Sequence, residues 1–464
     1  MRHIQAELRV LSDGEIEQIH EASVQILSKI GLHVPNAQVC RAAAALGAKT
    51  DGETVRIPSE ALAPILAEAR AGRHAFPKAG HTVRKITGNV STQVFTYDYS
   101  TGTRRRGTLQ DVRDGIALIE GLPNIPRSGA VVLPSDVPLP DVMCYREIYQ
   151  RARKDGGTYV LSAYAARYIL EMARVMGRTV SYLLDTVSPL SFTRESLEIG
   201  LLFAQAGMPL EMTPLVMAGS TAPVTLAGAL AQQNAEVLGS LFLIYTLTGK
   251  IAKYVGSAHS NDLMHSMMCS FGSPNQVLFG IATAQMAAFY GLASGSNSGL
   301  TDALAPDFQA GFEKSFSAVC SVLAGSDAIG GQGIVGADQG FSFAQLVLDD
   351  AWLDAVNYAL AGFEVNEDTL GLDTLEQVGI GGNFLSELHT VAHMRTSWWA
   401  NEVFPRQTFS EAQAPETALA RAQARANALI LENRAEDPVI PASLVQQLDE
   451  IVGEALRCRP EAGQ

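Results

Sequence analysis

The fold is indicated most clearly by residues 210 to 260, which read LEMTPLVMAGSTAPVTLAGALAQQNAEVLGSLFLIYTLTGKIAKYVGSAHS. A β-prone run that ends in small residues precedes a long apolar stretch, and a second β-prone run follows it. Thr221 and Pro223 suit the first turn of a helix, and Gly249 suits the position after its last turn. The segment therefore predicts a strand, a helix and a second strand parallel to the first.

Similar units repeat from about Pro126 onward. Candidate strands lie at Ser128–Leu133, Thr158–Tyr164, Leu183–Ser191, Leu210–Ser220, Ile251–Ser260, Leu292–Gly299 and Asp327–Gly336, with a weaker eighth at Val378–Phe384. Repeated units in a segment of this size predict an α/β protein with a closed (β/α)8 TIM barrel. An open doubly wound sheet is the alternative, because the sequence carries no information on strand order.

Three parts of the chain are expected. Residues 1–122 are predicted to form an N-terminal extension, with an amphipathic helix at Asp13–Ile30 and a β-hairpin that turns at Ser100–Gly102 and could cover the barrel as a lid. Residues 123–410 are predicted to form the barrel. Residues 411–464 are predicted to form C-terminal surface helices at Pro415–Arg434 and Pro441–Arg457.

Charge and hydropathy exclude several classes of partner. The formal net charge of -14 argues against nucleic acid, because a phosphate-binding surface needs clustered Lys and Arg. The longest apolar stretch contains Gln232, Gln233, Asn234 and Glu236, which favours a buried helix over a membrane span. Asn234 and Glu236 are expected to orient neighbouring loops or to form a subunit contact. With no signal-like N-terminus and no C-x-x-C pair, we expect a cytoplasmic protein without a membrane partner.

Small and neutral residues dominate the carboxyl ends of the candidate strands, where barrel enzymes build their active sites. A metal hydrolase would place several His and Asp residues there. A zinc site at His259, His265 and Cys269 can be written, but its spacing matches neither H-E-x-x-H nor C-x-x-C. We expect no directly bound metal and assign no catalytic residue, and a zinc-dependent methyltransferase or lyase stays an alternative.

Several separated blocks resemble the trimethylamine methyltransferase superfamily. They are Leu46–Ala48, Val216–Gly228, Gln233–Leu238, Pro306–Lys314, Gln345–Asp350, Gly381–Leu385 and His389–Thr390. The resemblance implies a (β/α)8 barrel that transfers a methyl group to the Co(I) corrinoid (cobalamin) of a separate partner protein. The trimethylamine enzymes carry pyrrolysine, whereas this chain has only standard residues, so it is similar to the non-pyrrolysine branch. Members of that branch act on quaternary amines such as glycine betaine, proline betaine and carnitine.

A quaternary ammonium leaves as a neutral amine, so positioning is the main task of such an enzyme. Aromatic faces suit the cationic head, although each candidate aromatic could equally fill the core. The expected substrate-binding residues are Phe95, Tyr97, Phe341, Phe343 and Phe384 for the head, with Tyr99 beside them, and His259, Gln332, Asn383 and His389 for a carboxylate. The expected corrinoid-binding residues are Gly219, Ser220, Thr221, Ser257, Ser296, Asn297 and Gly331.

The sequence thus predicts a homo-oligomeric methyltransferase that moves a methyl group from a quaternary amine, with glycine betaine favoured, to the corrinoid of a partner protein. A non-catalytic betaine-binding barrel is the alternative from another class.

Overall fold

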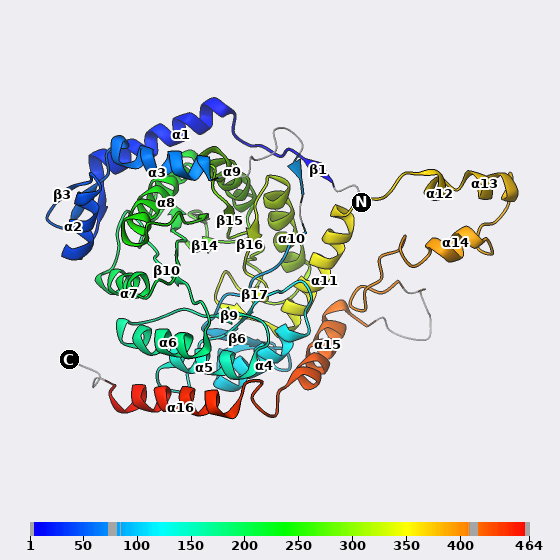
Figure 1. Ribbon diagram of the computed structural model, residues 1–464. Helices are drawn as coiled ribbons and strands as arrows, with labels where there is room; N and C mark the ends of the chain where they lie inside the picture. The colour runs from blue at the N-terminus through cyan, green and yellow to red at the C-terminus, as the bar shows by residue number, and fades with distance from the viewer. Residues whose placement is uncertain (1–3, 73–80, 84, 407, 409–415, 460–464) are drawn as a thin grey trace.

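The structure is a computed structural model that describes residues 4–72, 81–83, 85–406, 408 and 416–459. Short parallel strands lie in the interior and long helices surround them (Figure 1). Among the described residues, no helix is both long enough and apolar enough to cross a membrane.

The parallel strands pair in three groups. The strands are β8 (Ser128–Gly129), β9 (Gly156–Gly157), β10 (Tyr182–Leu183), β11 (Leu210–Glu211), β12 (Leu215–Ala218), β13 (Tyr254–Asn261), β15 (Ser294–Ser296) and β16 (Ala328–Ile329). β8 pairs with β9, β10 pairs with β11, and β12, β13, β15 and β16 follow one another in order. Because all of these pairs are parallel, the strands of each group end at a common edge.

A helix follows most of these strands. The helices of this part are α4 (Leu109–Glu120), α5 (Pro140–Arg151), α6 (Ala163–Met176), α7 (Arg194–Gln205), α8 (Leu226–Thr248), α9 (Pro274–Tyr290), α10 (Phe308–Leu323) and α11 (Phe343–Leu360). The predicted alternation of strands and helices is therefore confirmed, and six of the seven stronger candidate strands overlap an observed strand, whereas Thr158–Tyr164 begins directly after β9.

Two sequence-based boundaries are wrong. Helix α6 begins at Ala163, inside the predicted strand Thr158–Tyr164, because the Ser162 hydroxyl caps it by accepting the Ala165 N–H at 3.1 Å. Helix α8 begins after Thr225 rather than Thr221, since the Thr225 hydroxyl accepts from Gly228 N. Gly249 ends α8 as predicted, with a φ of 65°.

The predicted eighth strand at Val378–Phe384 is also wrong. It contains the end of helix α13 (Leu372–Val378) and an exposed turn, where Gly379 and Gly381 have positive φ angles of 66° and 78°. Left-handed residues interrupt a strand, so this segment cannot extend a sheet.

Residues 88–93 instead lie between the first and last parallel strands. On one side, Gln93 N donates to Val131 O at 3.0 Å and Leu133 N donates to Gln93 O at 2.7 Å. On the other side, Gln332 N donates to Asn89 O at 3.2 Å. A segment that the sequence places in the N-terminal extension thus connects β8 with the residues after β16.

The N-terminal part covers one side of the strand and helix assembly. It contains β1 (Gln5–Ala6), α1 (Asp13–Gln25), a π-helical turn (Ile26–Ile30), β2 (Leu32–His33), α2 (Ala37–Ala45), β3 (Lys49–Asp51), β4 (Thr54–Arg56), α3 (Ser59–Ala71) and β5 (His81–Thr82). α1 and α3 pack on α8 and α9, and α2 packs on α8. The predicted helix at Asp13–Ile30 is confirmed, with its last turn widened.

The predicted hairpin is confirmed as β6 (Phe95–Asp98) and β7 (Thr103–Arg106), which pair antiparallel. It is part of a larger sheet, because β6 also pairs with β18 (Gly340–Phe341), which pairs with β17 (Ile334–Val335). Strand β14 (Cys269–Ser270) pairs with the end of β13. The hairpin therefore lies beside the loop that follows β16.

The C-terminal helices α15 (Ala418–Asn433) and α16 (Ala442–Arg457) confirm the two predicted surface helices. α15 packs on α4 and α11, and α16 packs on α5 and α6. The short helices α12 (Glu367–Leu370), α13 and α14 (Leu388–His393) lie on an extension that projects away from the rest of the molecule (Figure 1).

One buried carboxylate joins α4 to α5. Glu147 is fully buried and forms ion pairs with Arg113 at 2.9 Å, Arg146 at 3.0 Å and Arg151 at 2.6 Å. Burial acts to raise the pKa of Glu147, but hydrogen bonds from Arg113 and Arg151 outweigh it and hold this pKa below its usual 4.5. The ionised form is therefore favoured in the folded state.

We expect Glu147→Gln to lower the free energy of unfolding by about 3 kcal/mol near neutral pH, because three arginines lose their counter-charge. Since the folded pKa is depressed, this contribution is present above pH 4.5 and is lost as the pH falls through the folded pKa. Urea unfolding at a series of pH values would check both points. A difference between wild type and variant that stays constant down to low pH would contradict the assignment.

Candidate active site

Tyr159 follows β9 and Asp185 follows β10, whereas Asp338 lies between β17 and β18. Tyr159 is 43% exposed, yet its pKa is raised to about 12, first by burial and then by the charges of Asp338 and Asp185. The charges of both carboxylates therefore act on the Tyr159 hydroxyl through space.

Both carboxylates are held by single hydrogen bonds. Asp185 follows β10 and accepts from Thr213 N at 2.7 Å, and burial raises its pKa to about 7. Asp338 is exposed, adopts a left-handed conformation (φ 61°) and accepts from Gln93 Nε2 at 2.8 Å, and desolvation of its carboxyl group by neighbouring groups raises its pKa. In the part of the chain that the structure describes, neither carboxylate forms an ion pair, although the Lys314 charge acts on Asp338 through space, so a cationic ligand would be attracted to both.

His259 forms a separate polar group at the end of β13. Its side chain is fully buried, with Nε2 3.0 Å from Ser257 Oγ and 3.4 Å from Asn297 Nδ2, and its ring centroid lies 4.2 Å from that of Phe271. Burial lowers the pKa of His259 to about 3. The imidazole is therefore neutral at physiological pH and supplies no positive charge for an anionic group.

The loop after β10 is held from behind by a helix side chain. Glu236 of α8 is fully buried and accepts from Thr186 Oγ1 at 2.5 Å, Ser188 Oγ at 2.7 Å and Leu190 N at 3.0 Å. This arrangement confirms the expectation that Glu236 orients a neighbouring loop. Asn234 bonds Ser23, Tyr254 and Tyr290 inside the same chain, so the alternative of a subunit contact is wrong for both residues.

Two further acidic residues hold the loops after β13 and β15. Asp302 accepts from Phe271 N at 2.6 Å and from Ser270 Oγ at 2.6 Å. Glu313 of α10 in turn accepts from Asp302 N at 2.9 Å and Thr301 Oγ1 at 2.6 Å. The strand-end loops are thus connected to one another through partly buried polar side chains.

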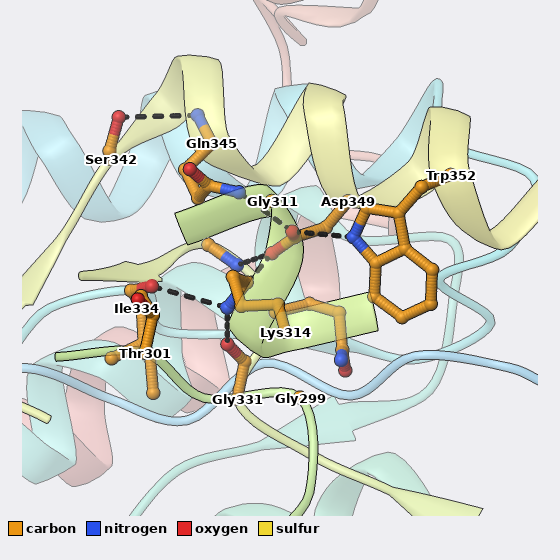
Figure 2. A network of polar contacts seen from close by, with 12 residues as sticks. Gly299, Thr301, Gly311, Lys314, Gly331, Ile334, Ser342, Gln345, Asp349 and Trp352 are labelled. Atoms are coloured by element: carbon orange, nitrogen blue, oxygen red, sulfur yellow. Dashed lines mark hydrogen bonds and ion pairs between the residues drawn. The ribbon is translucent and has the colours of Figure 1, made fainter. Parts of the chain in front are cut away.

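A buried ion pair holds the glycine-rich loop after β16 (Figure 2). Lys314 of α10 donates to Gly331 O at 2.7 Å and lies 3.2 Å from Asp349 of α11, and both side chains are fully buried. Asp349 also accepts from Gly333 N at 2.7 Å. Burial raises the pKa of Asp349, and the Lys314 charge opposes that shift. The backbone of Gly331–Gly333 is therefore held at both ends: the Lys314 ammonium of α10 donates to the Gly331 carbonyl, and the Asp349 carboxylate of α11 accepts from the Gly333 N–H.

Comparison with known proteins identifies the family. The sequence model described as "Trimethylamine methyltransferase (MTTB)" matches residues 1–455. The chain belongs to the trimethylamine methyltransferase family. The predicted resemblance is therefore confirmed over nearly the whole sequence.

The proteins that this chain resembles are named for different methylated amines. The chain is 28% identical to "Glycine betaine methyltransferase" of Desulfitobacterium hafniense (strain Y51), over 96% of this chain and 98% of that protein. It is 29% identical to "Trimethylamine methyltransferase MttB" of Desulfitobacterium hafniense (strain DSM 10664 / DCB-2), over 83% of this chain and 82% of that protein. A solved monomethylamine methyltransferase (MtmB) from Methanosarcina barkeri aligns with a TM-score of 0.48 and 12% identity, covering 97% of this chain and 95% of that one.

The structure separates the predicted cage aromatics. Phe341 is fully buried in the core, and Phe343 packs edge-on against it at 5.2 Å. Phe95 lies under Arg104, whose guanidinium is 4.5 Å from the ring centroid, so that face is already occupied by a cation. Tyr97 is half-buried on the same strand, and Tyr99 is 42% exposed.

The predicted carboxylate donors are also separated. Asn383, Phe384 and His389 lie on the projecting extension, where His389 Nε2 is 3.0 Å from Asp368 O. Gln332 is fully buried and accepts from Asn89 N at 2.6 Å. Of the predicted substrate residues, His259 and Gln332 are the two at strand ends.

The predicted corrinoid-binding residues divide by accessibility. Ser220 is exposed and bonds Asn261, and Thr221 is half-buried. Ser257, Ser296 and Gly331 are buried, the serines in hydrogen bonds to neighbouring side chains. At Gly219 a Cβ would lie 2.8 Å from Leu263, and at Gly331 one would lie 2.4 Å from Leu300. These two glycines are thus required by packing within the chain itself.

The zinc alternative receives no support from side-chain placement. His265 is 83% exposed and lies 3.0 Å from Asp262, whereas His259 is fully buried. In the part of the chain that the structure describes, no three or more His, Cys, Asp or Glu side chains are placed to hold a metal ion.

Tyr159, Asp185 and Asp338 were missed by the sequence interpretation. Neighbouring side chains of an extended strand point to opposite faces. Because Val160 and Leu184 are buried, the adjoining Tyr159 and Asp185 are expected to point away from the core. An ionisable residue within an otherwise apolar strand is the signal that could have found Asp185.

We expect Asp349→Leu to cost about 3–5 kcal/mol of folding free energy, because it leaves the Lys314 charge buried without a partner. The double variant Lys314→Met with Asp349→Leu should recover most of that loss, as the charge is removed as well. Denaturant unfolding of both variants and the wild type would measure this difference. A double variant that is as unstable as Asp349→Leu alone would contradict the role of the pair.

Proposed function

We propose that this chain is a methyltransferase that moves a methyl group from a quaternary amine, with glycine betaine favoured, to the Co(I) corrinoid of a partner protein. The similarity to a glycine betaine methyltransferase over 96% of this chain supports the substrate class. The observation that carries the proposal is the family match over residues 1–455, and Tyr159, Asp185 and Asp338 are the residues that we propose for the substrate site.

The proposed scaffold is a closed (β/α)8 barrel within the predicted residues 123–410, joined by one strand from the N-terminal part. Residues 88–93 bond β8 on one side and the loop after β16 on the other. With this segment as a strand, we propose that the three parallel groups, which pair only within themselves, follow one another around a ring. A closed ring brings all carboxyl ends to one face, which is the usual place for the active site of this fold.

The proposed substrate site places the trimethylammonium head between the Tyr159 ring and the two carboxylates. An aromatic face attracts a quaternary ammonium without a hydrogen bond, which this group cannot donate. Asp185 and Asp338 add a negative field in a partly desolvated site, where charges act more strongly than in water.

The corrinoid is proposed to approach across an accessible apolar rim. Val224 is 62% exposed before α8, Met264 and Met268 are 84% and 51% exposed before α9, and Leu304 is 81% exposed before α10. These residues lie on three successive connections from a strand to its helix. Ser220 and Thr221 lie beside this rim. Flexible methionines suit contact with a partner that binds and leaves repeatedly.

In the proposed reaction, the residues of this chain mainly bind and orient. Asp185, Asp338 and Tyr159 hold the ammonium so that one N-methyl carbon faces the rim. A Co(I) corrinoid, when the partner presents it, supplies the nucleophile that accepts the methyl group. The C–N bond breaks with its electron pair moving to nitrogen, and dimethylglycine leaves as a neutral amine. Because no proton transfer is needed, a site without an acid catalyst suffices.

Mixing the protein with Co(I) cobalamin and glycine betaine tests the proposal directly. We expect the visible spectrum of the methylated corrinoid to appear together with dimethylglycine. Tyr159→Leu should raise the KM for glycine betaine about tenfold, whereas Tyr159→Phe should keep most of the affinity for glycine betaine. Absence of both products with glycine betaine, proline betaine and carnitine would overturn the assignment. Betaine binding without turnover would select a non-catalytic betaine-binding protein instead.

The raised pKa of Asp185 gives a second prediction. Since the ionised carboxylate attracts the cation, glycine betaine should bind more tightly as the pH rises through 7, with affinity falling by up to about tenfold per pH unit below the pKa. Calorimetric titrations around pH 7 would measure the trend, and Asp185→Asn should remove it. Tighter binding at lower pH would show that Asp185 faces the betaine carboxylate as a neutral acid.

A further inference from the structure

The projecting segment from residue 363 to residue 398, called the arm below, has no core of its own (Figure 1). It leaves the molecule after the buried Leu360 of α11 and returns where Trp399 Nε1 donates to Asp354 at 2.8 Å. Every residue from 363 to 402 is described by the structure, and none of them is buried. The arm therefore rests on the rest of the chain at its two ends.

The arm is rich in exposed apolar side chains. Twelve large hydrophobic residues are at least 41% exposed: Phe363, Val365, Leu370, Leu372, Leu375, Ile380, Phe384, Leu385, Leu388, Val391, Met394 and Trp398. If a fully exposed large side chain presents about 200 Å², these fractions amount to about 1,500 Å² per arm. A stable protein interface needs about 800 Å² from each partner. The arm alone thus offers enough apolar surface for a permanent interface.

Internal hydrogen bonds nevertheless give the arm a defined shape. His389 Nε2 lies 3.0 Å from Asp368 O, and Thr390 Oγ1 donates to Phe384 O at 2.6 Å. Asn366 caps α12 by accepting from Thr369 N at 2.8 Å. These contacts connect α12 and α14, so the apolar side chains are presented on an ordered surface rather than on a polar, solvated loop.

The size of this surface favours a permanent partner over one that comes and goes. Contiguous exposed apolar patches of more than a few hundred Å² mark interaction sites in soluble proteins. A corrinoid partner must bind and leave in each catalytic cycle, and would expose the arm each time. A second copy of the same chain can cover it continuously.

The same chain also carries a matching apolar surface on α10. Phe308, Phe312 and Phe316 stack along this helix with ring centroids 6.4 and 5.5 Å apart. They are 88%, 54% and 42% exposed. Three aligned aromatic rings provide a flat anchoring surface of the kind that dominates stable interfaces.

We propose that the arm docks on Phe308, Phe312 and Phe316 of α10 in a second copy of this chain, and that the arm of the second copy docks in the same way on the first. A two-fold arrangement lets each copy present its own arm and receive the arm of its partner, so both apolar surfaces are covered at once. The inference rests on the exposed side chains alone and stands independently of the methyl-transfer reaction.

Light scattering after size-exclusion chromatography tests the proposal on the full chain. We expect the wild type to have at least twice the mass of a single chain, and Leu385→Asp with Leu388→Asp to dissociate it, because two charges would be buried in an apolar interface. Both residues are at least 80% exposed, so the fold of the single chain should be unaffected. Leu431→Asp, at an equally exposed position on α15, is the matched control and should leave the mass unchanged.

Two results would overturn the inference. One is a monomeric wild type. The other is an arm variant that keeps the wild-type mass. If that variant also loses methyl transfer to a protein-bound corrinoid but keeps transfer to free corrinoid, the arm would be the surface that binds the corrinoid partner. Mass is measured without substrate, so failure of the proposed reaction would leave this test intact.

Cross-linking between copies locates the receiving surface. Leu388→Cys and Phe312→Cys are made in separate chains, each with Cys458→Ser to remove the exposed native thiol. When the two chains are mixed after dissociation, a short bis-maleimide should give a linked pair. Linkage should fall to background when Phe312→Cys is replaced by Leu431→Cys. Equal linkage with both would show that the arm does not dock on α10.

Discussion

Backbone hydrogen bonds on the two sides of residues 88–93 are the constraint on which the rest of the structure depends. Through Val131 and Leu133 this segment bonds the beginning of the parallel series, and through Gln332 it bonds the end. The glycine-rich loop, the hairpin β6–β7 and Asp338 all adjoin this connection. The candidate site therefore depends on contacts between parts of the chain that are far apart in sequence.

The sequence predicted elements whose pattern is local. Strands from Ser128 to Gly336 were recognised because β-prone runs alternate with long helices, and the hairpin because a Ser-Thr-Gly turn separates two alternating runs. Residues 88–93 read GNVSTQ, which has no apolar alternation. Their extended conformation is imposed by neighbours on both sides, and tertiary context of this kind overrides local propensity. The segment Val378–Phe384 was predicted as a strand from its local pattern, but its glycines form turns on the arm.

The predicted site residues and the residues that the structure favours share the region around the strand ends but differ in identity. Aromatic residues were chosen by type, but Phe341 fills the core, Phe95 is covered by Arg104, and Phe384 projects on the arm. Tyr159 and Asp185 belong to predicted strands, yet which face of a strand points to the site depends on a register that no single strand reveals. Charges that act through space on Tyr159 come from different strands and become visible only when these are assembled.

Glu236, Lys314 and Asp349 hydrogen-bond the backbone of the strand-end loops from the helices behind them. The outward-facing side chains of those loops take no part in these backbone contacts. Residues such as Ser220 and Met264 can then be exchanged during evolution without loosening the scaffold. One framework of this kind can be diversified by changes confined to its outermost side chains, which makes it a practical starting point for redesign.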